Sequence, residues 1–290
     1  MTARTPTVAL IGTLDTKGVE IAYVRDRLLG LGTRTLVIDS GILGEPAIDC
    51  ADISREQVAT AAGTTLAALR LSPSRGAAIE RMREGVRRTV LDGYTGGAVQ
   101  GVLCLGGSEG AVMGAYAMAA LPIGVPKLIV SPTASGRRTF GPLVGSVDTF
   151  VLHSVVDILG INAISRVVYD NAAAAMAGMV RTARPMAADP AAALVALTML
   201  GNTTTAVMHL LPLLEVGGYQ GVIFHANGVG GVGCRRWWWP AASISPPTVP
   251  ARRSPRRCAV GPATTTTPRR RWSGSTARRW PGSAPCWRRG

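Results

Sequence analysis

Five short loops in this sequence place glycine beside polar side chains, and each directly follows an apolar run. The loops span residues 12–18, 106–110, 131–136, 201–205 and 226–231. Glycine lets the backbone come close to a ligand, and free N–H groups at the start of a following helix attract anions. Serine and threonine hydroxyls add hydrogen-bond donors. This chemistry suits a ligand that carries phosphate, ribose or sugar hydroxyls.

Three charged side chains near these loops each allow two interpretations. Lys17 is one of only two lysines in the chain, and beside Asp15 it could either meet a phosphate or lie at the surface. Asp39 ends a predicted strand, where a carboxylate can hold ribose hydroxyls, although the residue type alone favours a helix-cap or turn contact. Glu109 is expected to cap its helix rather than bind a metal, and no metal ligands are predicted.

The first four loops match neither GxGxxG nor GxxxxGK[ST], so each alone is typical of an ordinary turn between a strand and a helix. Their recurrence favours one binding site, because the carboxyl ends of parallel strands meet at one sheet edge. No Ser-His-Asp order, HExxH motif or pair of acids identifies a catalytic group, so the sequence does not decide whether the protein is an enzyme. The candidate ligand-binding residues are Gly12, Thr13, Asp15, Thr16, Lys17, Asp39, Gly106, Gly107, Ser108, Ser131, Ser135, Gly136, Asn162, Arg166, Thr203, Thr204, Gly228 and Gly230.

The apolar runs before these loops predict strands that alternate with helices. Strands are expected at residues 7–11, 35–39, 101–105, 127–130 and 149–152. Helices are expected over residues 19–29, 54–69, 74–91 and 163–180, and a further helix should end at residue 121. Strand, helix and strand joined by short connections form a right-handed βαβ unit. The predicted fold class is therefore α/β, with a Rossmann-like doubly wound parallel sheet over residues 1–183.

A second α/β pattern begins after a proline-bearing linker at residues 181–190. Strands are expected at 194–200 and 221–225, on either side of a helix that ends at residue 215. Residues 184–231 therefore predict the start of a second Rossmann-like lobe. That lobe is expected to be truncated after two strands, which leaves an unpaired sheet edge.

The composition changes abruptly at residue 232. Residues 232–290 hold all six tryptophans and 13 arginines, but no Leu, Asp, Glu or Lys. So few aliphatic residues cannot bury a core, and the dominant residue types are those that GC-rich DNA encodes when it is read out of frame. This tail is therefore expected to be out of frame or disordered. The alternative is an Arg/Trp arm that binds single-stranded nucleic acid.

Nearly all of the net charge of +14 resides in this tail. Its 13 arginines are part of 31 basic residues, which leaves 18 basic against 17 acidic residues in the rest of the chain. The body is nearly neutral, so nucleic acid is not its expected partner. The cysteines follow no zinc or disulfide spacing, and neither a secretion signal nor a membrane span is predicted. The body is expected to be cytoplasmic.

Taken together, the motifs resemble the ATP-binding domain family of the tomato mosaic virus resistance protein. The resemblance follows the chain in order over residues 7–231. It is carried by GTLDTKGVE at 12–20, LGGS at 105–108, LPIGVPK at 121–127, SVVDI at 154–158 with Asn162, Ser165 and Arg166, and FHA at 224–226. The TMLGNTTT stretch at 198–205 and Asn227 depart from the family's pattern.

The resemblance implies two Rossmann-like lobes of about four hundred residues in all. It further implies a homodimer that binds ATP, with or without Mg, near the cleft between the lobes. The family's second lobe continues at the point where this chain enters its Arg/Trp tail. An enzyme or sensor for a phosphorylated or sugar-like small molecule is the alternative function.

Overall fold

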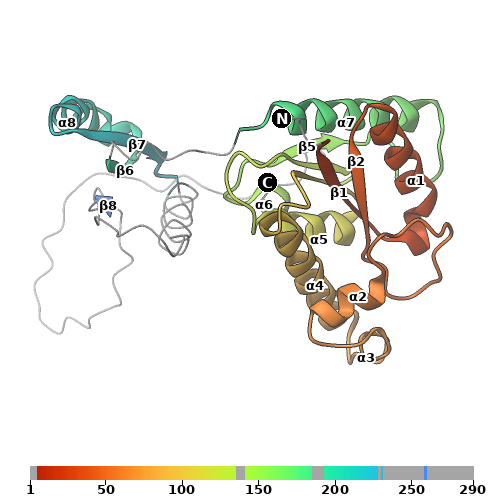
Figure 1. Ribbon diagram of the computed structural model, residues 1–290. Coiled ribbons are helices and arrows are strands. Elements are labelled where there is room, and N and C mark those ends of the chain that lie inside the picture. The colour runs from red at the N-terminus through yellow and green to blue at the C-terminus, as the bar shows by residue number, and fades with distance from the viewer. Residues whose placement is uncertain (1–4, 135–140, 185–192, 228–229, 231–257, 260–290) are drawn as a thin grey trace, which may run out of the picture.

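A five-stranded, all-parallel sheet forms the centre of the first lobe (Figure 1). The computed structural model describes residues 5–134, 141–184, 193–227, 230 and 258–259. The strands are β1 (Thr7–Gly12), β2 (Arg34–Asp39), β3 (Gly101–Leu105), β4 (Lys127–Ser131) and β5 (Phe150–His153), in the order β2-β1-β3-β4-β5. This is a doubly wound order, and it confirms the predicted fold class.

Helices cover both faces of this sheet (Figure 1). One face packs against α1 (Leu14–Gly30) and α7 (Ala163–Thr182), and the other against α2 (Arg55–Ala61), α4 (Arg75–Thr95) and α5 (Ser108–Met118). Along β1, Val8 and Leu10 face the first pair of helices, whereas Ala9 and Ile11 face the second group. Both faces are buried, so the strands are apolar runs without alternation.

The first helix begins at Leu14, so the prediction that residues 12–18 form a loop and the helix starts at residue 19 was wrong. The carboxylate of Asp39, 25 residues away, accepts a hydrogen bond from the Leu14 N–H at 3.0 Å and so caps the earlier start. Within the helix, Lys17 departs from helical geometry, with φ −130° and ψ 17°. The apolar spacing alone could not reveal this first turn.

The single helix predicted over residues 54–69 is two helices, α2 and the short α3 (Leu66–Arg70). Gly63 between them has φ +75°, a conformation that ends a helix and favours glycine. Thr65 then caps α3 by accepting a hydrogen bond from the Ala68 N–H at 3.2 Å. A capping box of Ser54 and Gln57 is present at the start of α2. A further short helix, α6 (Gly141–Val144), precedes β5.

A second sheet follows the first lobe. Strands β6 (Ala193–Met199) and β7 (Tyr219–His225) pair in parallel, connected by the 3₁₀ turn η1 (Gly201–Thr203) and helix α8 (Thr204–Val216). Two residues of the tail, β8 (Cys258–Ala259), pair with β6 on its other side. The strands and helix predicted here are confirmed. Among the described residues, no helix has the length and apolar character needed to cross a membrane.

Candidate functional site

A pocket of about 640 Å³ lies at the carboxyl edge of the five-stranded sheet. It lies beyond β1 and β3, which are adjacent in the sheet but not consecutive in the chain. This switch point is where doubly wound sheets bind their ligands. The polar residues that line it are Thr13, Asp15, Thr16, Lys17, Ser40, Arg70, Ser72, Ser74, Arg75, Gly107, Ser108, Glu109 and Gly110. The apolar residues are Ile42, Leu43, Leu69, Ala78, Ile79 and Met113.

Three helices begin at this pocket. Thr13, Ser74 and Gly107 are the N-cap residues of α1, α4 and α5, and all three line it. The N-terminal end of a helix carries a partial positive charge. Gly107 offers no side chain to cap α5, whose first internal bond runs from the Ala111 N–H to the Gly107 carbonyl at 2.9 Å. The helix therefore leaves the N–H groups of residues 108–110 for other acceptors.

Glycines in the first and second predicted loops permit this close packing. A Cβ on Gly106 would lie 2.6 Å from the backbone nitrogen of Ala111, so α5 can start directly beside the end of β3 only because residue 106 has no side chain. A Cβ on Gly12 would lie 2.5 Å from the Cδ1 atom of Ile21, which packs α1 against β1. Both glycines shape the pocket without lining it.

The first turn of α1 contributes hydroxyls and a cation. The Thr13 and Thr16 hydroxyls lie 2.8 Å apart and line the pocket. Lys17 also lines it, and its ammonium donates a hydrogen bond to the carbonyl of Ile158 in the loop before α7. Lys17 is therefore oriented by the fold rather than extended into solvent, and a carbonyl can occupy only one of its three N–H donors.

Of the two interpretations of Asp39, the structure shows the helix-cap and turn contacts. Its Oδ1 atom accepts hydrogen bonds from the Leu14 N–H at 3.0 Å and the Gly41 N–H at 2.8 Å, and the residue is 1% exposed. Burial raises the pKa of this carboxyl, and the two N–H donors oppose the increase. The side chain thus fixes the start of α1 to the loop that follows β2.

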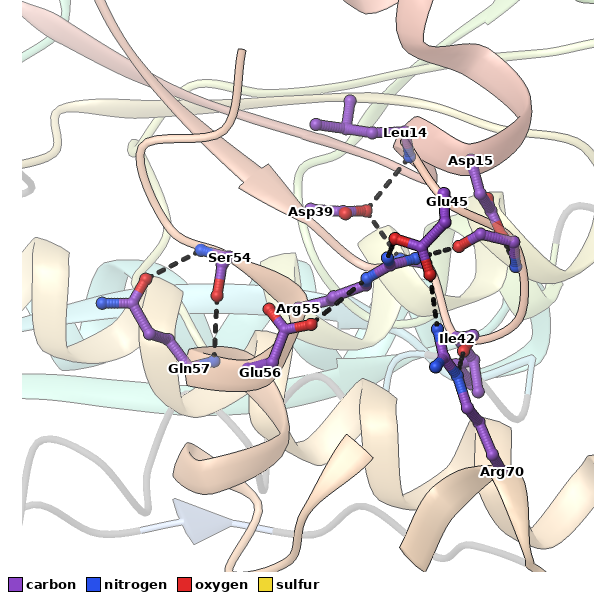
Figure 2. Close-up of polar contacts among 12 residues, drawn as sticks. Leu14, Asp15, Asp39, Ile42, Glu45, Ser54, Arg55, Glu56, Gln57 and Arg70 are labelled. Atoms are coloured by element: carbon purple, nitrogen blue, oxygen red, sulfur yellow. Dashed lines mark hydrogen bonds and ion pairs between the residues drawn. The ribbon is translucent and has the colours of Figure 1, made fainter. Parts of the chain in front are cut away.

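The loop after β2 forms one wall of the pocket, and charged side chains hold it in place (Figure 2). The Oδ2 atom of Asp15 accepts a hydrogen bond from the Gly44 N–H at 3.1 Å. Arg55, which is 4% exposed, donates to the Gly44 carbonyl and pairs with Glu45 at 2.5 Å. Arg70 donates to a neighbouring carbonyl of the same loop at 2.8 Å. These contacts bring the apolar residues of the loop to the pocket.

Six of the predicted binding residues line this pocket: Thr13, Asp15, Thr16, Lys17, Gly107 and Ser108. Gly12, Gly106 and Asp39 support them from the strand ends.

Other predicted residues make contacts away from the pocket. The Ser131 hydroxyl lies 2.9 Å from that of Thr133, and Asn162 caps α7 by accepting from the Ile164 and Ser165 N–H groups. The Arg166 guanidinium lies over the ring of Tyr23, 5.4 Å from its centroid.

The remaining predicted residues belong to the second lobe or to undescribed segments. The Thr203 and Thr204 hydroxyls donate to the Leu200 carbonyl at the start of α8, and Gly230 follows β7. Ser135, Gly136 and Gly228 lie outside the described residues.

Sequence reasoning missed the half of the pocket that comes from the long connection between β2 and β3. Ser40, Arg70, Ser72, Ser74 and Arg75 belong to this half. Only Ser74 carried a local signal, because it is the N-cap of α4 and accepts a hydrogen bond from the Ala77 N–H at 3.2 Å. Further along α4, Arg83, Arg87 and Arg88 pair with Glu80 and Glu84 and do not line the pocket.

The fold and the pocket define a doubly wound α/β protein with a pocket at its switch point. Within that class, the chain belongs to the uncharacterised protein family UPF0261. The model of the family's N-terminal domain matches residues 6–185, and that of its C-terminal domain matches residues 192–235.

Proteins from bacteria and from a plant are similar in sequence to this chain. A UPF0261 protein of Clostridium tetani is 38% identical over 224 residues, which cover 77% of this chain and 54% of the relative. One from Brucella suis is 37% identical over 235 residues, or 80% of this chain and 55% of the relative. The ToMV susceptible protein tm-1(GCR26) of Solanum lycopersicum is 33% identical over 247 residues, which cover 79% of this chain and 32% of the relative. The predicted resemblance is confirmed, and the chain spans about half the length of the bacterial relatives.

Proposed function

We propose that the protein binds ATP in the pocket at the β1/β3 switch point. The observation that carries this proposal is the convergence of three helix N-termini, at Thr13, Ser74 and Gly107, on one pocket. Phosphate groups are the ligands that such helix ends favour, because backbone N–H groups and the helix dipole act together. The α5 terminus is the best receptor, since no side chain caps it.

Cations on the pocket wall complement a polyphosphate. Arg75 is the first residue of α4 and lines the pocket, and among the described residues its guanidinium has no ion pair. Arg70 pairs with the exposed Glu45 at 3.4 Å, a long contact that a phosphate can replace. Lys17 adds a third positive charge beside the α1 terminus.

The apolar wall supports a nucleotide over a phosphorylated sugar. Ile42, Leu43, Leu69, Ile79 and Met113 line the same pocket as the helix termini. Binding of a flat base against these side chains removes apolar surface from water, which a sugar ring cannot do to the same extent. The volume of about 640 Å³ falls within the range of about 300–1,000 Å³ that is usual for small-ligand sites.

Thermal unfolding with a ligand panel tests this proposal. ATP should raise the unfolding temperature in a saturable manner, because a ligand at a hundred times its Kd stabilises the folded state by about 2.7 kcal/mol. Stabilisation by phosphorylated sugars without any effect of nucleotides would instead favour the alternative ligand class.

Two matched arginine variants on α4 locate the site. Arg75→Ala should weaken ATP binding by about tenfold, because one charge-assisted contact is lost. Arg81→Ala is the control, since Arg81 is an exposed residue of the same helix that does not line the pocket. Equal losses in both variants would show that ATP binds elsewhere.

A further inference from the structure

Glu20 is a buried carboxylate outside the pocket. It belongs to α1, is only 2% exposed and does not line the pocket. Its Oε1 atom accepts a hydrogen bond from the Gly160 N–H, 140 residues away along the chain. Among the described residues it forms no ion pair. Burial of a charged group costs free energy unless other groups compensate for it, so packing alone does not account for this side chain.

The segment that Glu20 holds is the β5–α7 loop, residues 154–162, which connects β5 to α7. Its backbone is strained at Val155, where φ is +66°, a rare value for a β-branched residue; Gly160 has φ +73°. The hydroxyls of Ser154 and Ser165, both residues 1% exposed, donate to carbonyls of the loop. Strain of this kind persists only where surrounding contacts fix the backbone, so the loop has one defined shape.

That shape presents the Ile158 carbonyl to Lys17. The Lys17 ammonium donates to this carbonyl, two residues before the Gly160 N–H that Glu20 holds. Ile158 is fully buried in the core between the sheet, α1 and α7, and Lys17 lines the pocket. Among the described residues the ammonium makes no second hydrogen bond and no ion pair. Two of its three N–H donors are therefore left for a ligand.

We propose that Glu20 is a positioning residue: through Gly160 and the Ile158 carbonyl, it holds the Lys17 ammonium in place for the phosphates of the ligand. This inference rests on the proposed function, which supplies the phosphates. A free lysine loses rotamer freedom when it binds a ligand, whereas an anchored lysine has already lost it on folding. The Glu20 carboxylate also attracts the ammonium, since both side chains contact the same short segment of the loop.

Amine labelling tests the positioning without a ligand. The chain has two lysines and Lys127 is fully buried, so acylation of the native protein followed by peptide mass spectrometry reports on Lys17. Glu20→Leu removes the acceptor and should speed the labelling of Lys17 by about fivefold, the equivalent of one hydrogen bond. Glu20→Gln keeps an acceptor for the Gly160 N–H and should restore nearly the wild-type rate. A wild-type rate in folded Glu20→Leu would overturn the positioning.

Tyr23→Phe is the matched control, because it removes another hydrogen bond between α1 and α7, from the Tyr23 hydroxyl to Asp170 at 2.8 Å. It should leave the labelling rate unchanged. If Glu20→Leu does not fold, Ser165→Ala loosens the same loop, since it removes the hydroxyl that donates to the Gly160 carbonyl at 3.3 Å. This milder variant should also speed labelling of the lysine, and an unchanged rate would again overturn the positioning.

A double-variant cycle in calorimetric titration with ATP tests what the positioning is for. Lys17→Met should weaken ATP binding by about tenfold or more, because a charge-assisted contact is lost, and Glu20→Leu should weaken it by about fivefold. In the Lys17→Met background Glu20→Leu should have no further effect, since it acts only through the ammonium. Additive losses, or unchanged affinity in Glu20→Leu, would overturn the inference alone. Absence of ATP binding by the wild type would overturn the proposed function, while the labelling rates would still decide whether Glu20 anchors Lys17.

Discussion

Replacing Gly106 by alanine should displace the N-terminus of α5 and weaken phosphate binding. A Cβ at this position would lie 2.6 Å from the Ala111 nitrogen and 2.6 Å from the Gly110 carbonyl carbon. These are backbone atoms and cannot rotate away as a side chain would. The separation is about 0.8 Å short of ordinary van der Waals contact, so the first turn of α5 must shift by a similar distance.

That shift exceeds the tolerance of a hydrogen bond. N–H···O distances span about 2.7–3.2 Å, so a displacement of about 0.8 Å takes an N–H group out of reach of a bound phosphate. A hydrogen bond to a charged group contributes about 1.5–3 kcal/mol. The loss of one such bond corresponds to about 10- to 100-fold weaker ATP binding. Overpacking should also destabilise the fold by about 1–3 kcal/mol.

Calorimetric titration with ATP and denaturant unfolding would measure both effects. Gly178→Ala is the matched control, because Gly178 lies within α7, does not line the pocket, and would carry a Cβ that meets no atom within 4 Å. Alanine within a helix is favoured over glycine by about 0.5–1 kcal/mol, so this variant should keep its affinity and lose no stability. A folded Gly106→Ala protein with wild-type ATP affinity would refute the reasoning about the α5 terminus.

Four further predictions concern stability, protonation and the reading frame. Lys127→Met should destabilise the fold by about 2–4 kcal/mol in denaturant unfolding, because the fully buried ammonium binds two carbonyls and a carboxylate; an unchanged midpoint would contradict this. A hydrogen bond from Arg87 lowers the pKa of Glu84 to about 2, so its stabilising contribution is present above about pH 4.5 and is lost as pH falls towards 2. The wild type should therefore lose more stability over this interval than Glu84→Gln, and parallel curves would count against the ion pair. Burial raises the pKa of Cys104 to about 12, so peptide mass spectrometry after thiol labelling near pH 8 should find it modified only in unfolded protein. Sequencing the codons of residues 228–236 should reveal an inserted or missing base, and an intact frame would reject that account of the tail.

Much of the fold followed from local patterns, because the central strands are buried on both faces. The apolar runs before residues 12 and 106 correspond to β1 and β3, whose residues are almost completely inaccessible. Features that depend on distant residues were not predictable. The first turn of α1 is capped by Asp39 at the end of β2, and no sequence pattern within residues 14–18 indicates that contact.

The candidate site, too, was predictable from the sequence only in part. The rule that ligands bind at the carboxyl ends of parallel strands located the loops after β1 and β3. It also selected Ser131, whose hydroxyl makes a local contact with that of Thr133. The opposite wall, from Ser40 to Arg75, comes from a long connection whose path depends on the tertiary contacts of Arg55 and Arg70 (Figure 2). A pattern of single residues could not place that wall beside the loops.

Hydrogen exchange at the start of α5 would test the central claim most directly. If the phosphates of ATP accept hydrogen bonds from the N–H groups of Ser108, Glu109 and Gly110, saturating ATP should slow exchange at these amides. Exchange at Thr203 and Thr204, which begin α8 in the second lobe, should not change. Saturable ATP binding with protection at Thr203 and Thr204 and none at residues 108–110 would contradict the account.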